Sequence, residues 1–136
     1  MKCCNSGLSR RQKAAQMLYE YLDEYYDEQS NIIVLGDWND DTKDEPGEHC
    51  FEPFFQDDRF YFSTANIAKD PAQASYPNEP YVSFLDHIMV SEKLLPKTSY
   101  YEVKTLLMGE YMGEFPIYEA YISDHLPVML SFSITN

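Results

Sequence analysis

Three short acidic motifs follow one another along the chain, and each borders an apolar run. They occupy residues 36–40, 84–88 and 123–128, and five of their polar side chains could do chemistry as carboxylates, an amide and an imidazole: Asp37, Asn39, Asp86, Asp124 and His125. Phosphoester cleavage needs a divalent cation to offset the phosphate charge, a carboxylate to activate water, and a donor for the developing negative charge. The ordered set therefore predicts a metal-assisted phosphoester-cleaving site.

The cation expected at this site is magnesium or manganese, because hard oxygen ligands suit these ions. Asp37, Asn39 and Asp124 supply such ligands near strand ends, where loops converge. Asp86 is expected to orient the His125 ring by accepting from one ring nitrogen, which favours the charged imidazole. We therefore expect the ends that carry Asp37, Asp86 and Asp124–His125 to meet in one cleft.

Each of these residues taken singly also has a structural interpretation. A Gly-Asp pair after a strand is often only a turn, and Asp86 could simply accept from loop amides. Of the other histidines, His87 lies on the strand face opposite Asp86 and is expected to pack, and His49 in an acidic loop is expected to be solvated. The Asp-His pair occurs twice, each time before an apolar strand, and this repetition favours the catalytic interpretation.

A calcium-binding loop is one alternative for the first motif. Asp37, Asn39, Asp41 and Glu48 fall at positions 1, 3, 5 and 12 of that pattern. Thr42 stands where the pattern requires glycine, and a strand precedes the loop where a helix should. The calcium interpretation is therefore the weaker one.

A protein-binding surface is a second, non-enzymatic alternative. Tyrosine and phenylalanine concentrate in four stretches, at 19–26, 51–62, 100–101 and 111–121. Such richness is compatible with an interface. Without clear periodicity, however, it more often indicates core.

Length, charge and cysteine content set further bounds. A chain of 136 residues fits one domain with a modest core, and its 44% apolar content is typical of globular proteins. The formal net charge of −13 disfavours nucleic acid and anionic membranes but is compatible with cations. No apolar run is long enough to span a membrane. Cys3, Cys4 and Cys50 are expected to be free thiols, since their number and spacing fit neither a disulfide framework nor a zinc site.

The elements that must position these residues are a helix and several strands. Helical spacing predicts a helix over 9–28, opened by a capping box of Ser9 and Gln12. Strands are expected at 32–35, which should be covered on both faces, and at 84–90, 101–107 and 128–134. A short helix is expected within 51–62, an acidic loop at 40–50, an irregular segment at 63–83 and a connection rich in Tyr and Gly at 108–122. The order predicts an α/β (α+β) fold with helix packed on sheet.

The three motifs together resemble the endonuclease/exonuclease/phosphatase superfamily, whose members are similar to pancreatic deoxyribonuclease. Residues 36–39 resemble its Gly-Asp-Phe/Leu-Asn motif, residues 85–88 its Leu-Asp strand motif, and residues 123–128 its terminal Ser-Asp-His-x-Pro-Val motif. The resemblance covers 36–128, and the expected helix also lies where the family has one. It implies a four-layer α/β sandwich with two mixed or antiparallel sheets between helices.

The resemblance also implies a role for each residue of the site. Asp37 would position or activate the attacking water, and Asn39 would contact the phosphate or the metal environment. Asp86 would pair with His125, and Asp124 would act near the metal through water. His125 would contact the scissile phosphate or transfer a proton.

Only the C-terminal part of the family domain is matched. The family's N-terminal half carries a metal-ligating Glu, and no segment here corresponds to it. We therefore expect a fragment with a partial metal shell, little activity alone, and open apolar faces near Leu35, Val128 and Leu130 that favour an oligomeric partner or a completing N-terminal half. The alternative is a non-catalytic or partner-completed interaction module. The phosphoester substrate stays open and could be DNA, RNA, a phosphoinositide, a nucleotide or another phosphoester.

Overall fold

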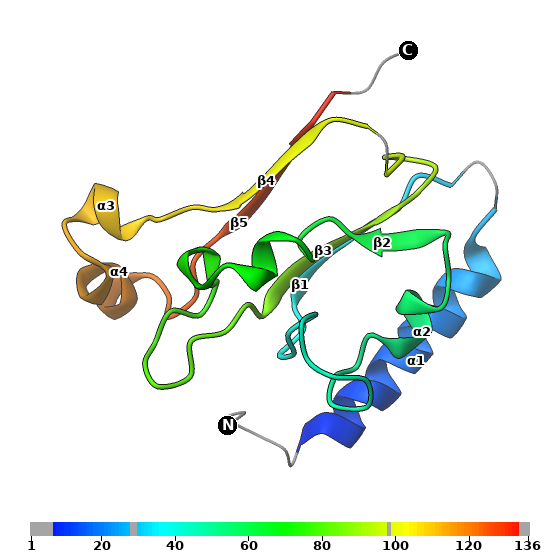
Figure 1. Cartoon of the computed structure of the whole chain (residues 1–136), viewed down its shortest axis with the longest axis horizontal. Helices are drawn as coiled ribbons and strands as arrows, with labels where there is room; N and C mark the ends of the chain where they lie inside the picture. The colour runs from blue at the N-terminus through cyan, green and yellow to red at the C-terminus, as the bar shows by residue number, and fades with distance from the viewer. Residues whose placement is uncertain (1–6, 28–29, 98, 134–136) are drawn as a thin grey trace.

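The computed structural model describes residues 7–27, 30–97 and 99–133. Within these residues the chain forms a small α+β domain of four α-helices and two antiparallel sheets, as expected for helix packed on sheet (Figure 1). The helices are α1 (Leu8–Tyr25), α2 (Glu52–Phe55), α3 (Gly109–Met112) and α4 (Phe115–Tyr121). The strands are β1 (Ile33–Asp37), β2 (Phe60–Phe62), β3 (Asp86–Ser91), β4 (Tyr101–Thr105) and β5 (Val128–Phe132).

The strands form two separate sheets. The larger has the order β1-β3-β2 and the smaller pairs β4 with β5, all antiparallel. The register of β1 on β3 places Leu35 opposite Ile88 and Asp37 opposite Asp86. Because side chains alternate along a strand, Asp86 shares a face of the sheet with Ile88 and Val90, as the sequence predicts.

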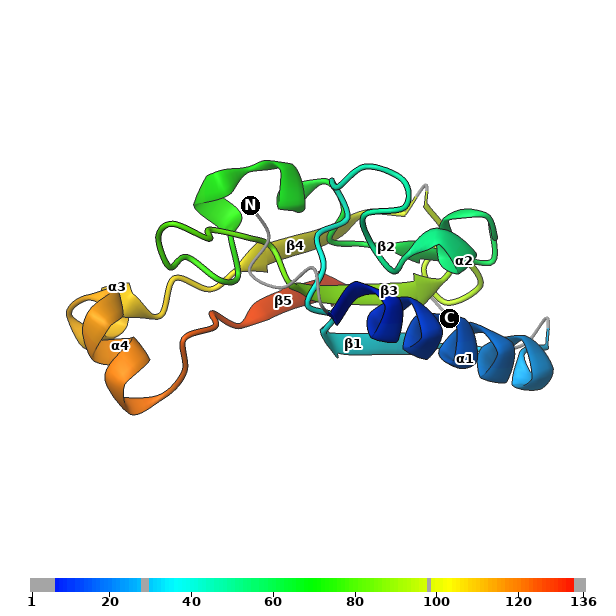
Figure 2. The same cartoon turned by 90° about the horizontal axis from the view of Figure 1, so that it is seen from below.

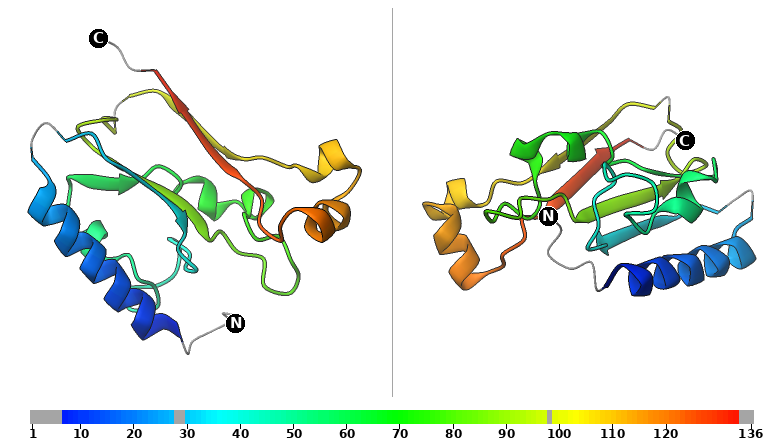
Figure 3. Two further views of the ribbon diagram at one scale, coloured as in Figure 1. Left: turned by 180° about the vertical axis from the view of Figure 1, so that it is seen from behind. Right: turned by 60° about the horizontal axis from the view of Figure 1, so that its bottom comes forward.

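The larger sheet lies between the helices α1 and α2 on one side and the β4–β5 pair on the other (Figure 2). Figure 3 shows the same arrangement from behind, with α3 and α4 at the end of the molecule away from α1. No helix in the described part of the chain is long and apolar enough to cross a membrane.

Aromatic side chains fill the space between the helices and the larger sheet. Phe51, Phe54 and Phe62 are at most 5% exposed and pack with Met89 and the half-buried Trp38. Their rings meet edge-on or tilted at centroid distances between 4.9 and 6.1 Å. Burial of each phenylalanine stabilises the fold by about 1.5–3 kcal/mol. The aromatic stretch at 51–62 is thus core.

A second, smaller core joins the two sheets. Ile88 and Val90 of β3 pack against Val128, Leu130 and Phe132 of β5. The open face expected at Val128 and Leu130 is therefore partly covered. This packing brings the start of β5 close to the start of β3, where Asp86 lies.

Helix α1 differs from the sequence expectation at both ends. It begins at Leu8 after Gly7, which makes no side-chain cap, and it ends at Tyr25. Ser9 is already inside the helix, so the predicted capping box is wrong. The Gln12 side chain instead donates to the carbonyl of His49, at 3.3 Å, and ties α1 to the loop before α2.

Strand β1 is an edge strand and is not covered on both faces, contrary to the prediction. Its partner β3 lies on one side, and no strand in the described part of the chain pairs with its other edge. Ile33 and Leu35, on the face shared with Asp37, are 46% and 69% exposed. Val34 points to the opposite face and packs in the helix-side core.

The connections contain more structure than expected. Residues 63–83 hold two 3-10 helices, η2 (Ile67–Lys69) and η3 (Pro71–Gln73), and a bridge between Tyr76 and Ser83. The stretch 108–122 folds into α3 and α4, which the sequence pattern did not predict. The short helix and strand β2 both form within 51–62, and residue 134 of the last predicted strand lies outside the described residues.

His49 and Cys50 are both buried in the loop before α2. His49 is 2% exposed and its ring accepts from the Phe51 N–H, so the prediction that it is solvated is wrong. Cys50 is a buried free thiol, as predicted, and burial raises its pKa to about 12. Cys3 and Cys4 lie outside the described residues.

Candidate active site

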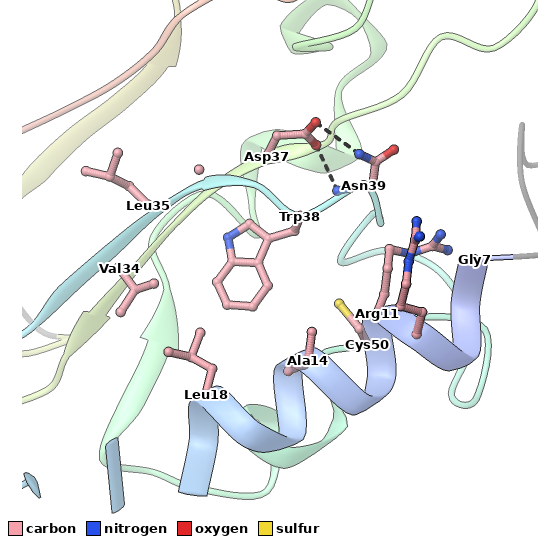
Figure 4. Close-up of a pocket in the computed structure, with 13 residues that line it drawn as sticks. Gly7, Arg11, Ala14, Leu18, Val34, Leu35, Asp37, Trp38, Asn39 and Cys50 are labelled. Atoms are coloured by element: carbon pink, nitrogen blue, oxygen red, sulfur yellow. Dashed lines mark hydrogen bonds between the residues drawn. The ribbon is translucent and has the colours of Figure 1, made fainter. Parts of the chain in front are cut away.

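Asp37 ends β1 and turns the chain sharply. Gly36 has a φ of 153° and Asn39 a φ of 54°, a left-handed conformation that asparagine tolerates well. The Asp37 carboxylate accepts from the Asn39 N–H at 2.8 Å and from the Asn39 side-chain amide at 3.0 Å. Asn39 thus fixes the orientation of the exposed Asp37 carboxylate (Figure 4).

Asp86 begins β3 directly opposite Asp37 in the antiparallel register. Two like charges on opposite strands repel one another. The fold therefore places two carboxylates where they need a positive group to compensate them. His125 supplies one such group.

His125 lies three residues before β5 and reaches Asp86 across the junction of the two sheets. Its Nδ1 is 2.7 Å from Asp86 Oδ2, and about a quarter of each side chain is exposed. Burial alone would lower the pKa of His125, but the hydrogen bond to Asp86 and the charges of Asp86, Asp37 and Asp124 outweigh it and raise the pKa above its ordinary value. The predicted pairing of Asp86 with His125 is confirmed.

The loop that carries His125 is held by side chains on both sides of it. The His125 N–H donates to the Ser123 hydroxyl at 3.0 Å, and the buried Tyr118 of α4 donates its hydroxyl to the His125 carbonyl at 3.2 Å. The Tyr76 ring packs at 5.3 Å from the imidazole. The unpredicted helix α4 therefore contributes directly to the position of the histidine.

Asp37, Asp86 and His125 form one cluster. One ligand atom from each lies within 4.8 Å of the other two, and this is the group of potential metal ligands found among the described residues. The side chains of Asp37, Asp86 and His125 thus converge as predicted, although 88 positions separate the first from the last (125 minus 37). The prediction of a single cleft is not borne out, because Asp37 lines one cavity and Asp124 and His125 line another.

The remaining predicted site residues lie beside this cluster. Asn39 orients Asp37, and Asp124 is exposed in the wall of a cavity that His125 and Asn39 also line. The charge of Asp124 acts on His125, but its carboxylate is not part of the three-residue group. Its role near a metal stays a prediction.

Two cavities adjoin the cluster. One of about 440 Å³ has Asn39, Asp124 and His125 in its wall, together with Tyr76 and Tyr81. The other, of about 650 Å³, runs between α1 and β1 and has Asp37 and Asn39 at one end (Figure 4). A substrate in the first cavity would lie against the imidazole.

A buried polar chain that sequence reasoning missed supports the loop after Asp37. Arg11 forms a two-pronged salt bridge with the fully buried Asp40 side chain, each bond 2.9 Å. The Asp40 carbonyl lies 3.1 Å from His87 Nε2, and His87 Nδ1 lies 2.9 Å from the Thr64 hydroxyl. Burial lowers the His87 pKa to about 4, so His87 is a neutral core histidine as expected.

Asp41 is a second buried carboxylate with a structural role. It accepts from the Phe84 N–H at 3.2 Å and pairs with the Lys43 ammonium at 3.0 Å. The calcium-loop alternative needs this carboxylate as a ligand, but both of its oxygens already have partners within the fold, whereas Glu48 of the same pattern is exposed. The geometry therefore favours the Asp–Asp–His cluster over a calcium loop.

Ser75, at 0% exposure, is a further residue that no sequence pattern indicated. Its hydroxyl accepts from the N–H groups of Leu85 and Asp86. Its partners lie ten or more positions away, so only the folded structure reveals them.

Comparisons of the chain with protein-family models, with curated proteins and with solved structures found no match. A function must therefore be inferred from the site itself.

Proposed function

We propose that this chain is the catalytic part of a metal-dependent phosphoester hydrolase of the endonuclease/exonuclease/phosphatase type. The observation that supports the proposal is the meeting of Asp37, Asp86 and His125 within 4.8 Å, from three separate motifs. Carboxylates and imidazole in one partly exposed cluster are the groups that such hydrolysis uses.

The roles follow from the geometry of the dyad. Asp86 stabilises the charged ring of His125 through the 2.7 Å hydrogen bond to Nδ1. The other ring nitrogen, Nε2, is then a charged donor for a phosphate oxygen. Asp37, exposed and held by Asn39, is placed to orient a water molecule.

The cluster fits a divalent cation in part. Asp37 offers an exposed carboxylate, and Asp86 offers the carboxylate oxygen that His125 does not use. Magnesium usually takes one or two carboxylates and completes its shell with water and substrate, and manganese suits the same oxygen ligands. When bound there, the cation would supply positive charge against the phosphate oxygens. The metal-ligating Glu that the resemblance implies has no counterpart among these residues, so we expect weak cation binding and slow turnover by the chain alone.

Charge favours a small phosphoester over a polyanion. The chain has 23 acidic and 10 basic side chains. In the cavity beside His125, Arg11 and Lys43 are both paired with buried aspartates. A nucleic-acid backbone would therefore meet repulsion.

The exposed edge of β1 favours a second candidate function. Among the described residues β1 has no strand partner on its outer edge, Leu35 is 69% exposed on one face of the strand, and the 650 Å³ cavity lies beside it. A strand added to this edge would extend the sheet toward the four-layer sandwich that the resemblance implies, and the polypeptide that supplies it would cover Leu35. The chain would then be an interaction module with the same fold, completed by another polypeptide.

Hydrolysis assays separate the two candidates. The substrates are bis(p-nitrophenyl) phosphate and p-nitrophenyl phosphate with magnesium or manganese, and the protein is the chain alone and the chain joined to an N-terminal half of a superfamily domain. Turnover that EDTA abolishes and that His125→Ala and Asp37→Ala each remove supports the hydrolase. Asp58→Ala, which removes an exposed carboxylate outside the site, is the control. Absence of EDTA-sensitive turnover in both forms would overturn the hydrolase proposal.

A further inference from the structure

The Asp86–His125 pair is built from two sheets that share no backbone ladder in the described part of the chain. Asp86 belongs to β3 of the larger sheet, and His125 lies on the loop that enters β5 of the smaller one. Side-chain packing joins the sheets. Apolar packing is not directional, so it does not by itself hold a 2.7 Å contact.

Ser75 bonds directly to both sides of this junction. Its hydroxyl oxygen accepts from the Leu85 N–H at 2.9 Å and from the Asp86 N–H at 3.0 Å. Its backbone carbonyl accepts from the Leu126 N–H at 2.7 Å, next to His125. One residue therefore fixes the backbone of the carboxylate and the backbone beside the imidazole.

The segment around Ser75 is itself anchored. Tyr76 exchanges two 2.9 Å backbone hydrogen bonds with Ser83, and its ring packs on the imidazole. On the other side, the Gln73 side chain accepts from the Thr105 N–H at 2.9 Å, at the end of β4. Residues 73–76 thus form a short strap that contacts both sheets.

We propose that Ser75 is a positioning residue that holds Asp86 and His125 in hydrogen-bonding register. The inference deepens the proposed function and rests on it for its catalytic meaning. Serine suits the position because its hydroxyl accepts two donors in a space with no exposure to solvent. Without that oxygen, the Leu85 and Asp86 N–H groups lose their acceptor, and the start of β3 can move away from the imidazole.

The test is a spectroscopic signature that does not require activity. Side-chain ¹H–¹⁵N NMR of the EDTA-treated chain should show a protected, low-field Nδ1–H signal from His125, which Asp86→Ala abolishes. Ser75→Ala should abolish or strongly broaden the same signal. His87 provides an internal reference, because its ring partners Thr64 and Asp40 are not bonded to Ser75.

Ser91→Ala is the matched control. Ser91 is also 0% exposed and also accepts two N–H groups, from Ile32 at 3.0 Å and Leu94 at 3.4 Å, but it lies at the other end of β3. The Ser91→Ala protein should have a lower free energy of unfolding but should keep the His125 Nδ1–H signal. If Ser75→Ala does not fold, Ser75→Cys keeps the shape of the side chain, fills the space left by the hydroxyl with a weaker acceptor, and should weaken the signal.

The outcomes separate this inference from the proposed function. In a form that turns over substrate, Ser75→Ala should lower kcat about 10- to 100-fold with KM little changed, since a small misplacement of catalytic groups has that effect. A folded Ser75→Ala or Ser75→Cys protein that keeps the full His125 signal would overturn the positioning role and leave the hydrolase proposal intact. Absence of the signal in the unaltered chain would overturn the positioning role, whereas the hydrolase proposal is decided separately by EDTA-sensitive turnover.

Discussion

Asp86→Asn tests the charge of the dyad without changing its shape. The 2.7 Å bond to His125 joins two groups that are each about a quarter exposed. A hydrogen bond to a charged group contributes about 1.5–3 kcal/mol when shielded from water, and a fully exposed ion pair about 0–1 kcal/mol. Partial screening places the expected loss between these limits, at about 1–2 kcal/mol in the free energy of unfolding.

This loss should depend on pH in a defined direction. The pKa of His125 is raised above its ordinary value of 6.5, so the folded state binds the proton more tightly than the unfolded state. The stabilisation is therefore fully present below 6.5 and is lost as the pH rises through the folded pKa. At higher pH, the amide introduced by Asp86→Asn still accepts from the neutral ring and no longer repels Asp37, so the substitution should be neutral or slightly stabilising there.

Urea unfolding of both proteins in EDTA, at about pH 5.5 and about pH 8.5, measures the effect. Burial lowers the pKa of His87 to about 4, so stability also falls as the pH drops from 6.5 toward 4. His87 is present in both proteins, and the difference between them removes its contribution. An equal loss at both pH values, or no loss at the lower one, would refute the charged dyad.

Three further substitutions test the metal site, the exposed edge and the core. Asp37→Asn should weaken manganese binding about tenfold or more, measured through the relaxation rate of the solvent water protons, whereas the control Asp58→Asn should leave the affinity unchanged. Equal manganese affinities for the two variants would contradict the assignment of Asp37 as a ligand. Because Leu35 is 69% exposed, Leu35→Lys should change the free energy of unfolding by less than about 0.5 kcal/mol but should reduce self-association measured by sedimentation. Unchanged self-association would show that another surface mediates it. Phe51→Ala should lower the free energy of unfolding by about 3–5 kcal/mol in urea, and a loss below about 1 kcal/mol would mean a loosely packed core.

The parts of the site that the sequence predicted correctly share a local signal. Alternation along residues 86–90 is enough to place Asp86 on the face of Ile88 and Val90 and His87 on the other. Residue type then predicts the pairing of Asp86 with His125, because a partly buried imidazole next to a carboxylate is a recurrent arrangement. Neither inference needs knowledge of the loops.

The parts that the sequence did not predict depend on partners far along the chain. Asp40 and His49 look like solvated members of an acidic loop, but Arg11 of α1 pairs with the first, and an aromatic core encloses the second. Helix α4 lacks a strong apolar period and is fixed by Tyr118, which is buried and bonds to the His125 loop. Tertiary contacts override local pattern in each case.

The junction of β1, β3 and the β5 loop breaks two general preferences at one place. Like charges rarely face each other across a ladder, yet Asp37 faces Asp86. Non-glycine residues rarely adopt positive φ, yet Asn39 does so to hold the Asp37 carboxylate. The repulsion between the two carboxylates costs stability, and the contacts of Ser75 and His125 with Asp86 keep them in place, whereas asparagine adopts its left-handed conformation at little cost. Natural folds tolerate such costs mainly where function requires them, and this is the strongest reason to regard the cluster as a site and not as a chance grouping of acidic side chains.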